Sequence, residues 1–142
     1  QLACAHIGSA EGKRYLSALA AAANYAFANR QLLARQAEET FLKVFGAGPS
    51  DLGIRLVYDV GHNNAKFEEH VVEGRTRNVL VHRKGATRAF PAGHPDVPVA
   101  YREIGQPVMV PGDMGRCSFV LVGTEAAMEQ TWGTVVMARA GR

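Results

Sequence analysis

The sequence has few of the features that identify several large classes of protein. It contains two cysteines, Cys4 and Cys117, in 142 residues. They form no CxxC or zinc-type spacing, so we expect neither a disulfide framework nor a zinc ribbon. No run of about 18 apolar residues occurs, and no charged segment followed by an apolar one opens the chain. These absences favour a cytoplasmic protein with no membrane partner.

The composition is ordinary for one globular domain. Hydrophobic residues make up 47% of the chain and charged residues 20%. A chain of this length buries roughly 68% of its unfolded surface. The net charge of +3 and the pI of about 9.1 permit an anionic partner such as RNA or a nucleotide. The chain begins with Gln1 rather than Met, and we interpret it as an excerpt of a longer protein.

The first third, residues 1–48, is predicted to be helical. Ser9 is a suitable N-cap, and apolar side chains recur at helical spacing as far as Phe45. The glycines and the proline of residues 46–49 should end this run. Because the run is long, we expect it to bend or break once, near Arg30. Arg30 itself is interpreted as a polar group satisfied within the fold.

Residues 51–135 change to short β-type runs. We expect strands at residues 54–60, 68–72, 78–83, 106–110 and 117–123, a hairpin turn at 73–76 and a loop at 87–98. Thr124 is expected to cap a last helix over residues 125–132. A helical part followed by mostly antiparallel strands predicts an α+β fold, organised as one partial domain.

Three polar loops follow expected strands and carry the candidate chemistry. In GHNN (61–64), the His62 imidazole suits zinc or manganese, and the amides of Asn63 and Asn64 could orient a phosphate or a base. In HRKGATRAF (82–90), four basic groups suit phosphate oxygens. In PGDMGRCS (111–118), glycine permits close backbone approach to a ligand, although the spacing matches neither Walker A nor GxGxxG. Ordinary hydrogen-bonded or solvated turns remain the alternative for each loop.

Several long segments resemble the RtcB family of RNA-splicing ligases. They are DVGHNNAKFEEH, VHRKGATRAFPAGHP and YREIGQPVMVPGDMGRCSFVLVGTEAAME. The opening QLACAHIGSAEG is also similar to the family's LACAP-x-x-SPEG helix entry, although His6 and Ala10 stand where prolines are usual. The resemblance extends to about Val135. It implies the RtcB α+β fold, of which this chain is a central-to-late portion.

The resemblance also implies an activity. Such ligases use GTP and Mn²⁺ to join RNA 2′,3′-cyclic phosphate or 3′-phosphate ends to 5′-hydroxyl ends, in tRNA splicing or RNA repair. A histidine is first guanylylated, GMP then passes to the RNA 3′-phosphate, and the 5′-hydroxyl displaces it. An archease-like activating protein is a further expected partner.

Residue roles carry over by motif. His62 is implied as the manganese ligand beside the nucleotide, and Asn63 as a guanylate contact. The implied nucleotide-binding residues further along are Pro111, Gly112, Asp113, Met114 and Ser118. Asp113 replaces a serine found in some members. Lys84 and Arg88 are weaker candidates for RNA phosphate binding.

The family's catalytic histidine is absent from this chain. The family has Cys-His-Gly-Ala-Gly-Arg where this chain continues after Val135 with VMARAGR. For one choice of codons, Val-Cys-His-Gly-Ala-Gly-Arg-Ala becomes Val-Val-Met-Ala-Arg-Ala-Gly-Arg when the last base of the valine codon is deleted. We therefore interpret residues 136–142 as an out-of-frame tail. A natural tail of a diverged homologue is the alternative.

Other expected parts of the site also lie outside this sequence. The family's remaining metal ligands, a cysteine and two histidines among them, lie upstream of the matched region, and a lysine that touches the nucleotide lies downstream. We therefore expect this chain to be inactive by itself. A non-catalytic nucleotide- or RNA-binding module of the same fold is the main rival. A metal-dependent phosphoesterase is weaker, because no HxH or HxD cluster occurs.

Overall fold

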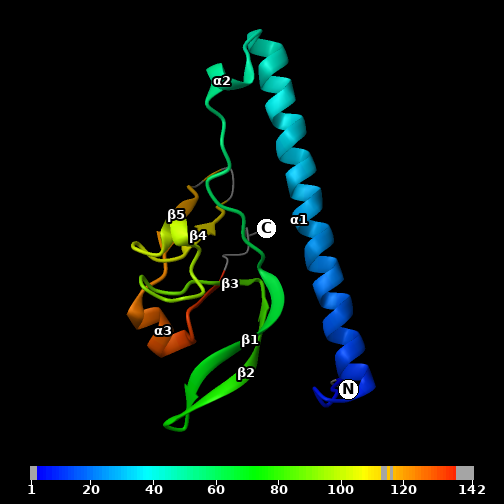
Figure 1. Ribbon diagram of the computed structural model, residues 1–142, viewed down its shortest axis with the longest axis vertical. Coiled ribbons are helices and arrows are strands. Elements are labelled where there is room, and N and C mark those ends of the chain that lie inside the picture. Colours follow the sequence, from blue (N-terminus) through cyan, green and yellow to red (C-terminus); the bar gives the residue numbers. More distant parts are fainter. Residues whose placement is uncertain (1–2, 113–114, 116, 137–142) are drawn as a thin grey trace. The chain divides into compact units, whose positions relative to one another are not determined.

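The computed structural model describes residues 3–112, 115 and 117–136 (Figure 1). The chain divides into two compact units, Gln1–Asp59 and Val60–Arg142. The first is helical, and the described residues of the second form three two-stranded antiparallel sheets and a short helix. This order confirms the predicted α+β class.

The first unit is built on α1, Ala10–Phe45, a helix of 36 residues. As predicted, the Ser9 side chain caps its start by accepting a hydrogen bond from the Gly12 amide, and it ends at Gly46 in the left-handed conformation. The short helix α2, Pro49–Leu52, follows. Within the described part of the chain, no helix combines the length and hydrophobicity needed to cross a membrane.

The predicted break near Arg30 is wrong, because α1 continues through that residue. Sharp helix kinks arise mainly at proline, glycine or inserted groups, and no proline or glycine lies between Gly12 and Gly46. Arg30 is satisfied only in part, because its Nη2 is buried and has no hydrogen-bond partner among the described residues. Its Nε lies 2.7 Å from Asp59 Oδ1, and its guanidinium lies 4.4 Å from the centroid of the Phe27 ring.

The strand predicted at residues 54–60 is also absent, since the whole segment between α2 and His62 has no regular secondary structure. Among the described residues no strand pairs with it. Leu56 and Val57 are 76% and 67% exposed. β-branched, apolar composition does not form a strand without a neighbour to take up its backbone hydrogen bonds. The GHNN segment therefore leads into a strand rather than following one.

The second unit begins with a long hairpin of β1, Asn63–Val72, and β2, Arg75–Lys84 (Figure 1). The strands expected at 68–72 and 78–83 are confirmed, and both are longer than predicted. The turn consists of Glu73 and Gly74, with φ of 51° and 74°. Positive φ at both positions is typical of the tight hairpin turn that matches strand twist.

Shorter elements complete this unit. They are β3 (Ala86–Arg88), a 3₁₀ turn (Val99–Tyr101), β4 (Pro107–Val110), β5 (Phe119–Val122), α3 (Glu125–Thr131) and β6 (Thr134–Val136). β3 pairs with β6, and β4 pairs with β5, both antiparallel. The Thr124 cap of α3 is confirmed by its hydrogen bond from the Ala127 amide at 3.2 Å. The segment predicted as one loop at 87–98 instead begins with most of β3, because β6 supplies it with a partner.

The core of the second unit surrounds Phe90. Phe90 is 1% exposed, and Ala89 and Val108 are completely buried. The backbone N–H of Gln106 donates to the Phe90 carbonyl at 2.9 Å. The side-chain Oε1 of Gln106 accepts from the backbone N–H of Phe90 at 3.2 Å. These two hydrogen bonds join the region after β3 to the start of β4, so the chain that follows β3 is anchored in the core.

Candidate functional site

Two of the predicted polar loops meet at one corner of the β1–β2 hairpin. Asn63 is the register partner of Lys84. The Gly85 amide donates to Asn63 Oδ1 at 3.0 Å, and the Ala86 amide donates to the His62 carbonyl at 3.2 Å. We call these five residues the His62–Ala86 corner. The side chains of His62, Asn63 and Lys84 are exposed there.

The end of β6 reaches the same corner. Val136 pairs with Ala86, and Val135 pairs with Thr87. The end of β6 at Val136 therefore lies next to the backbone that holds His62. The predicted out-of-frame tail is residues 136–142, and all of it except Val136 lies outside the described residues.

Alternation along the hairpin separates the two neighbouring asparagines. Successive side chains of a strand point to opposite faces, so Asn63 shares a face with Lys84, and Asn64 shares the other with Arg83. Asn64 Nδ2 donates to the Gly61 carbonyl at 3.1 Å. Asn64 thus stabilises the loop that contains His62, while Asn63 lies on the exposed face of the hairpin.

The basic groups of the second loop have different surroundings. Lys84 is exposed beside Asn63, whereas Arg83 is 2% exposed. Arg88 is held by protein groups: its Nε donates to Gln106 Oε1 at 3.1 Å and its Nη2 to the Asp96 carbonyl at 3.0 Å. Its predicted contact with RNA phosphate stays a prediction, and these bonds give it a structural role.

The third predicted loop is only partly described. The Gly112 amide donates to Ser118 Oγ at 3.2 Å, so the two ends of the loop approach each other. A Cβ at Gly112 would overlap the Cys117 carbonyl, which explains the need for glycine. Asp113 and Met114 lie outside the described residues, so the nucleotide role of Pro111–Met114 and Ser118 stays a prediction.

The described residues do not form a complete metal centre. Within the parts of the chain that the structure describes, no group of three or more His, Cys, Asp or Glu side chains is placed to hold a metal ion. His62 is a ligand type that suits manganese or zinc, but one imidazole is too few for either. Further ligands would have to come from outside the described residues.

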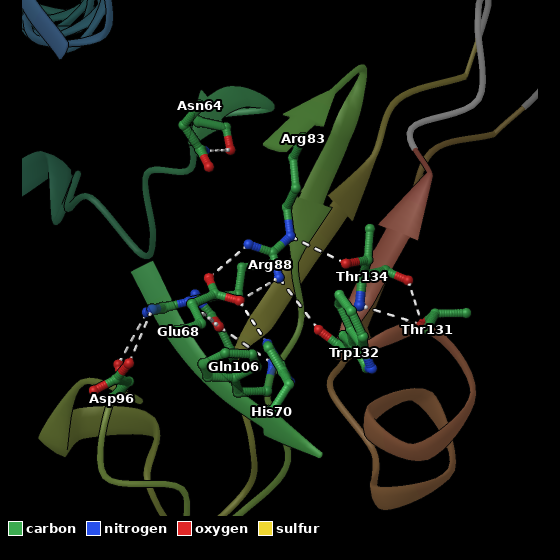
Figure 2. A network of polar contacts seen from close by, with 12 residues as sticks. Asn64, Glu68, His70, Arg83, Arg88, Asp96, Gln106, Thr131, Trp132 and Thr134 are labelled. Carbon is green, nitrogen blue, oxygen red and sulfur yellow. Dashed lines mark hydrogen bonds and ion pairs between the residues drawn. The ribbon is translucent and has the colours of Figure 1, made fainter. Parts of the chain in front are cut away.

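A buried polar network lies on the other face of the hairpin, and the sequence reasoning missed it (Figure 2). Arg83 Nη1 and Nη2 donate to the two carboxylate oxygens of Glu68 at 2.6 and 2.9 Å. His70 Nε2 lies 2.9 Å from Glu68 Oε2, and its ring stacks on Trp132 with centroids 5.0 Å apart. The sequence signal for this network is the alternation of side chains between the two faces of a strand. Once the register is known, this alternation puts Glu68, His70 and Arg83 on one face.

Burial and hydrogen bonding act in opposite directions on Glu68. Burial alone would raise the pKa of its carboxyl group. The hydrogen bonds from Arg83 and His70, together with the positive charges of Arg83 and Arg88, outweigh burial and lower the pKa below its usual value. The Glu68–Arg83 pair is therefore a charged pair in the interior of the second unit.

The fold and the corner define an α+β protein with a histidine, an asparagine and a lysine grouped at one end of a hairpin. The family model described as "tRNA-splicing ligase RtcB" matches residues 1–142. The chain belongs to the RtcB family.

Three curated relatives carry the name tRNA-splicing ligase RtcB. The chain is 58% identical over 134 residues to that of Archaeoglobus fulgidus, which covers 94% of this chain and 28% of the relative. It is 56% identical over 126 residues to the proteins of Pyrococcus abyssi and Thermococcus kodakarensis, covering 89% of this chain and 14% and 26% of the relatives. The chain thus spans less than a third of the length of each of these proteins.

Proposed function

We propose that this chain is a segment of a GTP- and Mn²⁺-dependent RNA ligase. Its substrates would be RNA ends bearing a 2′,3′-cyclic phosphate or 3′-phosphate, joined to 5′-hydroxyl ends in the cytoplasm. Family membership and the names of the relatives support ligation as the activity. The observation that carries the proposal is the convergence of the starts of β1 and β3 and the ends of β2 and β6 at the His62–Ala86 corner.

The corner suggests how its residues would handle a guanylate. Asn63 Oδ1 is occupied by the Gly85 amide, which leaves the two N–H groups of Nδ2 to donate to a phosphate oxygen. Lys84 lies directly opposite and adds a positive charge on the same face. His62 would offer its imidazole to Mn²⁺, which supplies polarisation of phosphoryl oxygens when bound. The loop at Pro111–Met114, with Ser118, would complete the nucleotide contacts.

We also propose that this chain cannot perform the covalent step alone. No histidine follows Val135, so no imidazole is available there to accept GMP. The missing metal ligands would have to be supplied by the rest of a complete ligase. An archease-like activator would act on that complete protein.

A chimera tests the proposal. Residues 1–135 of this chain replace the matching segment of the Archaeoglobus fulgidus relative, which keeps its own sequence on both sides. We expect a covalent GMP adduct with labelled GTP and Mn²⁺, and sealing of a 3′-phosphate RNA to a 5′-hydroxyl RNA. A chimera that binds GTP and RNA but forms no adduct would instead favour the non-catalytic binding module.

Asn78 offers a matched control for Asn63. Both are exposed asparagines on the same face of the hairpin, and Asn78 lies toward its far end, opposite Glu69. Asn63→Ala should slow adduct formation by roughly tenfold or more, the usual cost of losing one hydrogen-bond donor to a charged group. Asn78→Ala should leave the rate unchanged. Equal effects of the two substitutions would remove Asn63 from the site.

A further inference from the structure

The buried pair of Glu68 and Arg83 also contacts residues outside the β1–β2 hairpin. The side chains of the two residues are 2% and 1% exposed. Their bidentate contact, at 2.6 and 2.9 Å, fixes the guanidinium plane. Arg83 Nε and Nη2 also donate hydrogen bonds to the segment between α3 and β6 (Figure 2).

Those donors hold the start of β6. Arg83 Nε donates to Thr134 Oγ1 at 3.1 Å, and Arg83 Nη2 also donates to the Trp132 carbonyl at 3.2 Å. The two acceptors flank Gly133. His70, bonded to the same carboxylate, stacks on the Trp132 ring at an interplanar angle of 11°. Glu68 therefore orients two side chains, and both contact the segment that leads into β6.

This segment needs an external constraint. Trp132 has φ of 52° and Gly133 has φ of 57°. A left-handed conformation is unfavourable for a residue with a side chain, so Trp132 adopts it only where the surroundings hold it. Three contacts supply that hold: the C-cap bond of α3 from the Gly133 amide to the Ala127 carbonyl at 3.0 Å, the bond from the Ala89 amide to the Gly133 carbonyl at 2.7 Å, and the Arg83 bonds.

The position of β6 matters because of where it ends. From Thr134, paired with Arg88, β6 runs to Val136, paired with Ala86, whose amide bonds the His62 carbonyl. A shift at Trp132 or Thr134 would move the end of this three-residue strand relative to His62. The buried pair and the corner are thus joined through one short, stiff element.

We infer that Glu68 and Arg83 form a positioning pair that sets β6 against the His62–Ala86 corner. The inference rests on the proposed function, in which that corner binds guanylate and Mn²⁺. A buried ion pair is often no more stabilising than apolar residues of similar size, so its contribution here is geometric. Neither side chain touches the reacting groups.

Hydrogen exchange of the 142-residue chain tests the pair without catalysis. The informative variant is the double substitution Glu68→Leu with Arg83→Met, which leaves no unpaired buried charge. We expect its hairpin amides and melting temperature to stay close to those of the unsubstituted chain. We expect the amides of Thr134–Val136 to exchange about tenfold faster or more, as loss of the charged hydrogen bonds implies. Arg77→Met, which removes an exposed pair with Glu73, is the control.

The same substitutions in the chimera add a kinetic readout. The rate of GMP adduct formation should fall at least about tenfold, while the GTP concentration for half-maximal rate stays unchanged, because the pair positions β6 and does not contact the nucleotide. Arg83→Lys should slow adduct formation as well, since an ammonium group cannot make the bidentate contact and also reach β6. Unchanged exchange at Thr134–Val136 in the folded double variant overturns the inference. If the unsubstituted chimera forms no adduct, that result counts against the proposed function. The hydrogen-exchange result would still show whether Glu68 and Arg83 position β6.

Discussion

The Ala86 amide donates to the His62 carbonyl at 3.2 Å, and Ala86 is at the same time the register partner of Val136. One residue of β3 thus touches both the segment that precedes β1 and the end of β6. The candidate metal ligand and the end of β6 are joined by backbone pairing. Their proximity therefore depends on the strand register more than on any side-chain contact.

The first prediction concerns the stability of the corner. Asn63→Ala removes the acceptor of the Gly85 amide and should lower the free energy of unfolding by about 1 kcal/mol, the usual net value of one hydrogen bond. Urea unfolding followed by the fluorescence of Trp132, the single tryptophan, measures it. Asn78→Ala, on the same face, should change the free energy by less than about half as much. A larger loss from Asn78→Ala would show that this hydrogen bond does not hold the corner.

The second prediction concerns Gly123. A Cβ there would overlap the carbonyl oxygens of Phe90 and Ala89, which are backbone atoms of the core segment and cannot turn aside. Gly123→Ala should lower the free energy of unfolding by about 1–3 kcal/mol. Gly8→Ala is the comparison, because a Cβ there meets side-chain atoms of His6 at ordinary contact distance, 3.5 Å. Similar melting temperatures for the two variants would contradict the close approach at Gly123.

The third prediction concerns acid sensitivity. The pKa of Glu68 is lowered in the folded state, so its contribution to stability is present above the ordinary glutamate pKa of about 4.3 and is lost as the pH falls through the lowered value. Glu68→Gln should cost about 3 kcal/mol near pH 7, because it leaves Arg83 without its anion. The difference from the unsubstituted chain should shrink as the pH falls below about 4.3.

Glu69 provides the matched control for that titration. It is the neighbouring residue, exposed on the opposite face of β1. Glu69→Gln should leave the dependence of the free energy of unfolding on pH below about 4.3 close to that of the unsubstituted chain. If Glu68→Gln and Glu69→Gln gave the same acid profile, the buried pair would not be the source of the acid sensitivity.

The sequence predicts those parts of the fold that local signals determine. Caps and chain-stopping residues specify both ends of α1 and the start of α3, as Ser9, Gly46 and Thr124 show. The hairpin follows from apolar runs on either side of Glu73 and Gly74. These signals act over a few residues, so they can be recognised without knowledge of the tertiary fold.

Features that depend on distant partners were not predictable. The segment 54–60 has strand composition but no strand pairs with it among the described residues, and β3 forms because β6 lies beside it. The charges of Glu68 and Arg83 suggest solvent exposure until the register puts them on the buried face. Of the site, motif matching indicated the positions of His62 and Asn63, while their meeting with Lys84 and Val136 required the pairing itself.

The fourth prediction concerns the sequence after Val135. This chain as it stands should form no GMP adduct, even when mixed with the missing parts of a ligase, because it has no histidine there. Independent sequencing of the locus identifies the cause. If one base has been lost, putting it back would recover the Cys-His-Gly-Ala-Gly-Arg motif. An uninterrupted frame encoding VMARAGR in every read would contradict the deletion hypothesis and support a natural tail.

The most direct measurement of the whole account is adduct formation by the chimera with and without the His62 imidazole. Labelled GTP is supplied at limiting Mn²⁺, and protein-bound GMP is counted for the unsubstituted chimera and for His62→Ala. If the corner is a metal and guanylate site, the unsubstituted protein gains label, and His62→Ala loses it by at least about a hundredfold while keeping its melting temperature. Equal labelling of the two proteins at limiting Mn²⁺ would contradict the assignment of the His62–Ala86 corner as the site.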